Sequence, residues 1–207
     1  DGLVASYEVR RRRLAELDRA RADLAAAAAE IGRARRSAAP GLAAAVESHL
    51  GDLALPGARM EVDVADTDDH PGAGEAVEFR LATNAGVAPA GLSKVASGGE
   101  LSRVMLSLRL VLSEGPPTMV FDEVDAGIGG EAAVAVGRAL SELAEGRQVI
   151  VVTHLAQVAA FADAQILVEK SQGDGAATTT ARVLEGEDRV VELSRMLSGS
   201  PDSDVAH

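Results

Sequence analysis

The sequence predicts an α/β fold with a mostly parallel sheet, preceded by a long helix. Three observations support this prediction. Residues 3–37 are rich in Ala, Leu, Arg and Glu and contain no proline. Further along the chain, short apolar runs alternate with stretches whose apolar residues recur at helical spacing. Hydrophobic residues make up 47% of the 207 residues, which is enough for a packed core and excludes wholesale disorder.

The first helix is expected to carry an imperfect coiled-coil seam. Its heptad positions are Leu17, Leu24 and Ile31 in one series and Tyr7, Leu14 and Ala28 in the other. A helix of this length extends about 50 Å and needs a partner helix. Pro40 and Gly41 are expected to end it, because proline disfavours helical geometry in the preceding residue and glycine accepts a reversed backbone. A second, short helix is expected over residues 41–51.

After the helical segments, apolar residues recur at every second position instead of at helical spacing. Residues 60–65 and 77–82 alternate apolar and polar side chains, which predicts two half-buried strands joined by a polar loop. After a small-residue loop at 85–99, the expected elements are a helix at 100–113, a strand at 118–121, a helix at 130–144, a strand at 148–152, a helix at 155–161, strands at 165–169 and 178–184, and a helix at 190–197. We expect an arm of residues 1–40, a lobe of residues 41–198 and a loose polar tail of residues 199–207.

Charge and composition exclude several classes of function. The net charge is −12, yet residues 1–40 hold nine arginines against six acids, so the remainder is strongly acidic. Any DNA contact is therefore expected from the first segment or from parts outside this chain. The lack of cysteine excludes disulfides, thiolate zinc sites and cysteine nucleophiles. No apolar run approaches the roughly 18 residues that span a membrane, so we expect no membrane partner. Because the chain opens with Asp1, we expect it to be part of a longer gene product.

The stretch Ser97, Gly98, Gly99 and Glu100 directly precedes an apolar helix. A hydroxyl and two residues without side chains at a helix start leave backbone N–H groups and the positive end of the helix dipole open to an anion. An ordinary serine cap with flexible glycines is the alternative interpretation.

Polar residues also follow two of the predicted strands. Asp122 and Glu123 come directly after the strand at 118–121, at the edge where α/β proteins bind ligands. One acid of such a pair can hold Mg²⁺, usually through water, while its neighbour orients or deprotonates an attacking water. His154 ends the strand at 148–152 in the same way. Taken singly, the acids could be solvated strand-end residues and the histidine could be structural.

The order and spacing of these three features resemble those of the ATP-binding-cassette ATPases. Within that class the chain is most similar to the RecN family, the bacterial DNA-repair relatives of the structural-maintenance-of-chromosomes (SMC) proteins. The matching stretches are residues 83–86, 94–103, 121–130 and 153–160. The resemblance covers essentially the whole chain, including the helical arm, and implies the fold of the second lobe of an ATPase head.

The resemblance implies a role for each candidate residue. Ser97, Gly98, Gly99 and Glu100 would form the signature that closes over ATP held by the second head of a homodimer, and Asp125 would reach across that interface. Within its own head, Asp122 would be the Walker B acid on Mg²⁺, Glu123 the catalytic base or water-positioning residue, and His154 the switch histidine at the γ-phosphate.

One motif of a complete ATPase is missing. No G-x-x-x-x-G-K-[ST] phosphate loop occurs in the chain, and the similar family carries that loop in its N-terminal half. The chain therefore resembles a C-terminal half that needs the N-terminal half, a second head, ATP and Mg²⁺, in a cytoplasmic, nucleoid-associated protein of double-strand-break repair. The alternatives are an ATPase subunit of a transporter or of another SMC-type complex, and a non-catalytic coiled-coil interaction module.

Overall fold

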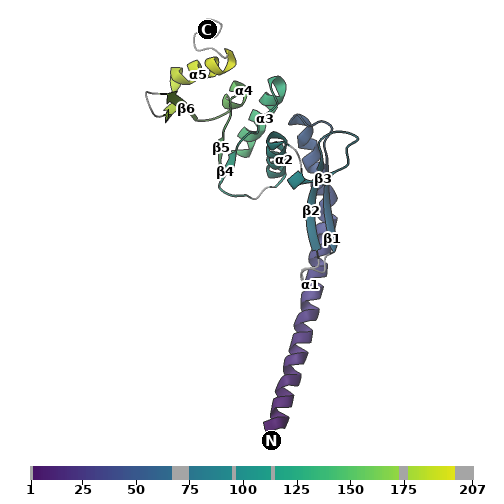
Figure 1. Cartoon of the computed structure of the whole chain (residues 1–207). Coiled ribbons are helices and arrows are strands. Elements are labelled where there is room, and N and C mark those ends of the chain that lie inside the picture. The colour runs from purple at the N-terminus through teal and green to yellow at the C-terminus, as the bar shows by residue number, and fades with distance from the viewer. Residues whose placement is uncertain (1, 67–74, 95–96, 113–114, 173–176, 199–207) are drawn as a thin grey trace. The chain divides into compact units, whose positions relative to one another are not determined.

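The computed structural model of the chain describes five segments (Figure 1). These are residues 2–66, 75–94, 97–112, 115–172 and 177–198. The chain forms two compact units, each of which combines two stretches of sequence. The first comprises residues 1–45 and 59–94, and the second comprises residues 46–58 and 95–207. The division into an arm of residues 1–40 and a lobe of residues 41–198 stays a prediction, and the expected tail of residues 199–207 lies outside the described segments.

Helix α1 is one continuous helix, Gly2–Asp52, with Pro40 inside it. The prediction that Pro40 and Gly41 end this helix is therefore wrong, and the expected second helix is the last part of α1. An interior proline removes one helical hydrogen bond and costs about 3 kcal/mol. The residues that follow are nevertheless helical, and in the second unit Val46 and Leu50 are completely buried. Each such side chain contributes about 1.5–3 kcal/mol, which offsets the proline.

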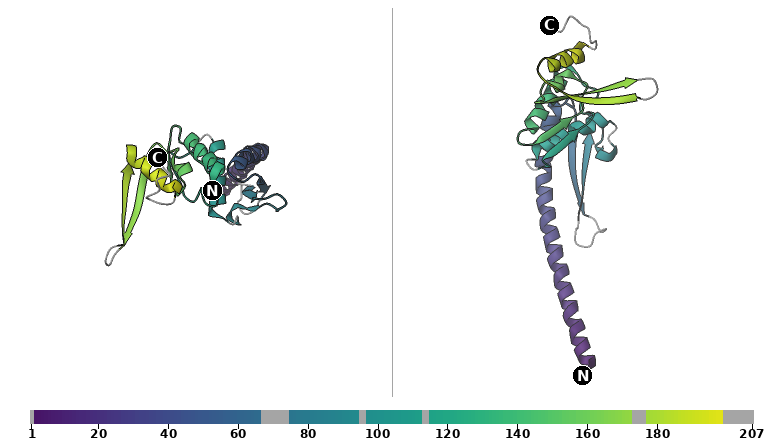
Figure 2. Two further views of the ribbon diagram at one scale, coloured as in Figure 1. Left: turned by 90° about the horizontal axis from the view of Figure 1, so that it is seen from above. Right: turned by 90° about the vertical axis from the view of Figure 1, so that its left-hand side faces the viewer.

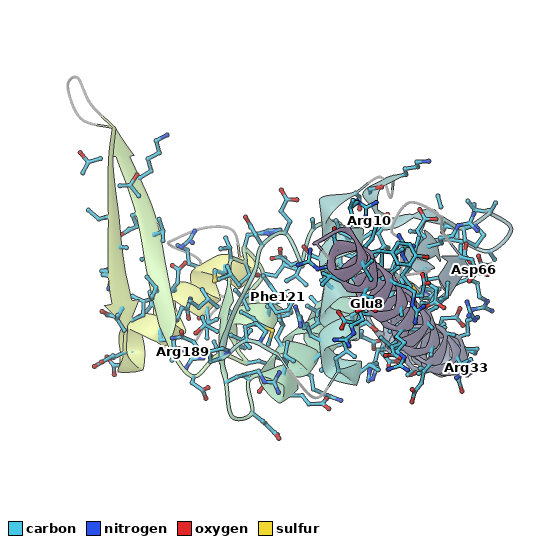
Figure 3. The ribbon with its side chains drawn as sticks, turned by 90° about the horizontal axis from the view of Figure 1, so that it is seen from below. Glu8, Arg10, Arg33, Asp66, Phe121 and Arg189 are labelled. Carbon is cyan, nitrogen blue, oxygen red and sulfur yellow. The ribbon has the colours of Figure 1, made fainter. Side chains whose placement is uncertain are left out.

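The seam predicted along α1 is exposed in the described chain. Leu14, Leu17, Leu24 and Ile31 all have about half of their surface open to solvent. Figure 3 shows Glu8, Arg10 and Arg33 projecting from this helix in different directions, as expected for a solvated helix surface. No helix in the described segments, α1 included, combines the length and the apolar character needed to cross a membrane.

The sheet of the first unit is antiparallel. Strands β1 (Arg59–Asp66) and β2 (Glu75–Ala82) confirm the two alternating segments, and they run beside α1 in Figures 1 and 2. A two-residue strand β3 (Ala90–Gly91) pairs with β2 and is followed by the short helix η1 (Leu92–Lys94). Both lie in the segment expected to be a loop. A strand of two residues is too short to produce a recognisable alternation of apolar and polar residues in the sequence.

An ion-pair cluster joins β2 to α1. The side chain of Glu75 is only 3% exposed, and its carboxylate lies 3.0 Å from Nη2 of Arg36 and 3.7 Å from Nη1 of Arg35. A β-carbon added to Gly32 would lie 1.3 Å from Oε1 of Glu75. The glycine in the body of α1 therefore provides the space that this carboxylate occupies on the helix.

The second unit contains the parallel pair that the sequence predicts. Strands β4 (Thr118–Phe121) and β5 (Gln148–Val151) are parallel neighbours. The helices α2 (Gly98–Val111), α3 (Gly130–Leu143) and α4 (Ala156–Ala159) belong to the same unit. Its hydrophobic core includes Leu106, Phe121, Val124, Val136 and Leu140. The α/β fold class is confirmed here.

The remaining strands, β6 (Gln165–Gln172) and β7 (Ala177–Leu184), form an antiparallel ribbon followed by α5 (Gly186–Ser198). Figure 2 shows this ribbon as a long two-stranded hairpin. Only four residues separate the strands, whereas a parallel crossover requires a dozen or more. The expected parallel pairing is found in β4 and β5, and the other described strands pair antiparallel in separate sheets.

Candidate functional site

The candidate site lies where β4 and β5 end. The two strands are parallel and in register, and the backbone N–H of Val152 donates to the carbonyl of Phe121 at 2.9 Å, just beyond the last strand pair. Asp122 and Glu123 therefore leave β4 at the same edge at which Thr153 and His154 leave β5. The structure brings together the acid pair and the histidine that the sequence singled out.

The acid pair occupies a tight turn after β4. The backbone N–H of Glu123 donates to Oδ1 of Asp122 at 2.9 Å, and the N–H of Ala126 donates to the carbonyl of Glu123 at 3.0 Å. Glu123 itself has a φ of +58°, a left-handed conformation that is unfavourable for a residue with a β-carbon. This turn leaves both acidic residues exposed and sends Val124 completely into the core. Strain of this kind persists only where surrounding contacts hold it, and it is frequent at functional sites.

The first residues of α2 contact this turn. A β-carbon on Gly98 would lie 2.2 Å from Oε2 of Glu123. A β-carbon on Gly99 would lie 2.9 Å from both the carbonyl oxygen and the β-carbon of Ala126. Close packing against backbone atoms therefore requires a glycine at position 99, whereas a β-carbon at position 98 would meet only the movable end of the Glu123 side chain. That carboxylate lies where the dipole of α2 favours negative charge.

Ser97 is the N-cap of α2. Its backbone is extended, and its hydroxyl accepts a hydrogen bond from the N–H of Glu100 at 3.1 Å. The serine-cap interpretation is thus realised in the structure. It does not exclude a second role, because the hydroxyl hydrogen of Ser97 is not used in this bond. For Glu100 and Ser97, nucleotide binding stays a prediction.

Two residues of α2 were given no role by sequence reasoning. The hydroxyl of Ser102 donates to the carbonyl of Asp122 at 2.7 Å. Arg103, which is 5% exposed, donates through Nη1 to the carbonyls of Val124 at 3.3 Å and Ala126 at 2.9 Å. Burial lowers the pKa of the Arg103 guanidinium, and the negative charge of Glu100 partly opposes this shift. The sequence could have indicated that Arg103 is buried. It precedes the apolar Leu106 by three residues and therefore lies on the same face of the helix.

The contacts of Asp125 lie within the second unit, and its side chain is 4% exposed. Its Oδ2 accepts hydrogen bonds from the hydroxyl of Thr153 and from the backbone N–H of His154, the latter at 3.0 Å. Nδ1 of His154 lies 3.1 Å from the same oxygen. A buried carboxylate needs such donors, and the residues that follow β5 supply them. The expected role of Asp125 at the nucleotide of a second head stays a prediction.

The described residues include no group of three or more His, Asp or Glu side chains placed to hold a metal ion by themselves. Mg²⁺ at nucleotide sites is usually bound by one or two carboxylates together with phosphate oxygens and waters. The exposed carboxylate of Asp122, at the end of a buried strand, is the kind of donor that such a site uses.

Comparison with solved structures identifies the fold. The chain resembles the Smc head domain with a coiled coil and joint from Pyrococcus yayanosii, with a TM-score of 0.52 and 22% identity over 74% of this chain and 28% of that one. The fold is that of an SMC-type head lobe. No family model matches the sequence.

Comparison with curated proteins defines the family. The chain is 47% identical to "DNA repair protein RecN" of Streptomyces coelicolor, over 93% of this chain and 36% of that protein. It is 44% identical to the protein of the same name from Deinococcus radiodurans, over 90% of this chain and 33% of that protein. The chain belongs to the RecN family, and it spans about a third of the length of these relatives.

Proposed function

We propose that this chain is the C-terminal part of an SMC-like ATPase that acts in the repair of DNA double-strand breaks. The observation that carries the proposal is the common edge of β4 and β5, where Glu123 contacts the start of α2 and His154 lies beside Asp125. The relatives in Streptomyces and Deinococcus, both named as DNA repair proteins, support the biological role.

In the proposed reaction, Asp122 would hold Mg²⁺ through water, and the bound ion would supply charge neutralisation for the phosphates of ATP. Glu123 would orient or deprotonate the attacking water, as a carboxylate adjacent to the metal site can. His154 would contribute beside the γ-phosphate. Ser97, Gly98, Gly99 and Glu100 present the N-terminus of α2 to the nucleotide of a second head, since free N–H groups at a helix start bind anions.

The proposed first partner is the N-terminal half of the same protein, which would supply the phosphate loop. One face of the β4–β5 sheet supports this, because Val120, Ile150 and Val152 are 64%, 45% and 57% exposed. Parallel sheets are normally covered on both faces. We propose that further strands and helices of the head cover these side chains, and that an outgoing helix covers the seam of α1.

The other proposed partners are a second head and DNA. Two heads would enclose ATP between them, so that binding joins the heads and hydrolysis releases them. DNA would bind mostly through parts outside this chain, because the second unit is acidic and repels phosphate. A cytoplasmic, nucleoid-associated location follows from this proposed role.

The test is Glu123→Gln in the full-length protein. We expect ATP hydrolysis to fall by about 10²–10⁴-fold, the usual contribution of a general base, while ATP binding is retained. Glu145→Gln, an exposed acid beyond the end of α3, is the matched control and leaves hydrolysis unchanged. Unchanged turnover in Glu123→Gln removes Glu123 from the mechanism. A full-length protein without any ATPase activity would instead favour the non-catalytic interaction module.

A further inference from the structure

We propose that Asp125 is a positioning residue for His154, and that it determines which ring nitrogen of His154 carries the hydrogen. This inference rests on the proposed ATPase function. It assigns to Asp125 a role within its own lobe, in addition to the contact across a head interface that the resemblance implied.

The short distance between the two side chains points to one tautomer. Oδ2 of Asp125 lies 3.1 Å from Nδ1 of His154 and also accepts from the backbone N–H of the same residue. An ionised carboxylate can only accept hydrogen bonds, so at this distance Nδ1 must carry a hydrogen. The lone pair of the neutral ring is then on Nε2. A neutral imidazole has one donor and one acceptor nitrogen, and the bond at one of them decides the other.

The position of the ring hydrogen determines which hydrogen bonds His154 can make with a ligand. Its side chain is 74% exposed, and Nε2 lies on the side of the ring away from the contact with Asp125. With the hydrogen on Nδ1, Nε2 of the neutral ring can accept a hydrogen bond from water and cannot donate one to a phosphate oxygen. Donation from Nε2 requires a second hydrogen on the ring.

Asp125 is itself held firmly. Arg103 donates to the carbonyls of Val124 and Ala126, the residues on either side of it. On the other side, the hydroxyl of Thr153 donates to Asp125 and accepts from the N–H of Leu155 at 3.0 Å. These bonds connect the first turns of α2 to the imidazole through the turn after β4. A positioning group must be fixed in this way if it is to fix its neighbour.

The first test is a double-mutant cycle in the full-length protein. We expect Asp125→Ala to lower kcat by about 10–100-fold, the loss seen when carboxylates that orient metal-binding histidines are removed, with KM for ATP unchanged. Asp125→Asn keeps an acceptor oxygen and should lose less. In a His154→Ala background neither substitution should lower kcat further, because residues that act as a unit are non-additive. Additive losses would overturn the proposal. Asp163→Asn, an exposed acid, is the control.

The second test does not depend on ATP. Spectra of ¹⁵N-histidine in the nucleotide-free full-length protein report which ring nitrogen carries the hydrogen, and the signals lost in His154→Gln belong to His154. We expect the hydrogen on Nδ1, and a shift toward Nε2, the form that free neutral histidine prefers, in Asp125→Ala. A hydrogen on Nε2 in the unsubstituted protein contradicts the inference. Correct spectra in a protein that does not hydrolyse ATP would contradict the proposed function alone.

Discussion

Oε2 of Glu123 occupies the space where a β-carbon of Gly98 would lie, since the two positions are only 2.2 Å apart. The carboxylate proposed as the base therefore contacts the first residue of α2. Gly99 contacts the same turn one residue further on, but its neighbours are the backbone and β-carbon of Ala126. The two glycines are adjacent in sequence, but Gly98 contacts the end of a flexible side chain, whereas Gly99 contacts atoms that are fixed by the backbone.

Gly98→Ala and Gly99→Ala should consequently have different effects. In Gly98→Ala the end of a flexible side chain can move, so we expect a stability change within about 0.5 kcal/mol and reduced ATP hydrolysis, because Glu123 is displaced. In Gly99→Ala the backbone must shift, so we expect a loss of about 1–3 kcal/mol. Urea unfolding and ATPase assays of the full-length protein measure both effects. A larger loss of stability in Gly98→Ala would contradict this explanation.

Ser97→Arg tests the proposed contact with a second head. A long cation in place of a small hydroxyl should block ATP-dependent pairing of heads, measured by light scattering of the full-length protein with and without ATP. Ser97→Ala is the control, because it removes the helix cap, at about 1 kcal/mol, without adding bulk. If Ser97→Arg pairs as well as Ser97→Ala, the start of α2 does not face the partner.

Arg103→Met should destabilise the second unit. It keeps most of the apolar contact of the side chain but leaves the carbonyls of Val124 and Ala126 without their donor. We expect a loss of about 2–3 kcal/mol, since hydrogen bonds from charged groups are the strongest of their kind. Arg138→Met, an exposed arginine on α3, is the comparison. Equal unfolding midpoints for the two variants would show that the Arg103 bonds contribute nothing.

Pro40→Ala should stabilise α1. The new N–H can bond to the carbonyl of Arg36, four residues earlier, and the strain of an interior proline is removed, for a gain of about 1–3 kcal/mol. Gly41→Ala is the matched control, because it raises helix propensity by about 1 kcal/mol, adds no hydrogen bond and meets no atom within 4 Å. Thermal unfolding of the full-length protein measures both. A lower stability in Pro40→Ala would mean that the proline ring makes a contact that stabilises the protein more than the missing helical hydrogen bond would.

Several elements follow from local sequence pattern. Alternation of apolar and polar residues predicted β1 and β2, and short apolar runs predicted β4 and β5, because burial of side chains in a strand has a period of two or is continuous. The prediction failed at Pro40, where the burial of Val46 and Leu50 outweighs a local helix-breaking signal. It also missed β3, whose two residues are defined only by their pairing with β2.

The candidate residues Ser97, Asp122, Glu123 and His154 could be selected from the sequence, since residue type and position relative to strand ends are properties of the sequence. Which of these groups touch was decided by the tertiary structure alone. Asp125 and His154 are separated by 29 residues and meet because β4 and β5 are parallel neighbours that end at one edge. Arg103 reaches the same turn from α2, and its carbonyl partners are backbone atoms that no sequence pattern distinguishes.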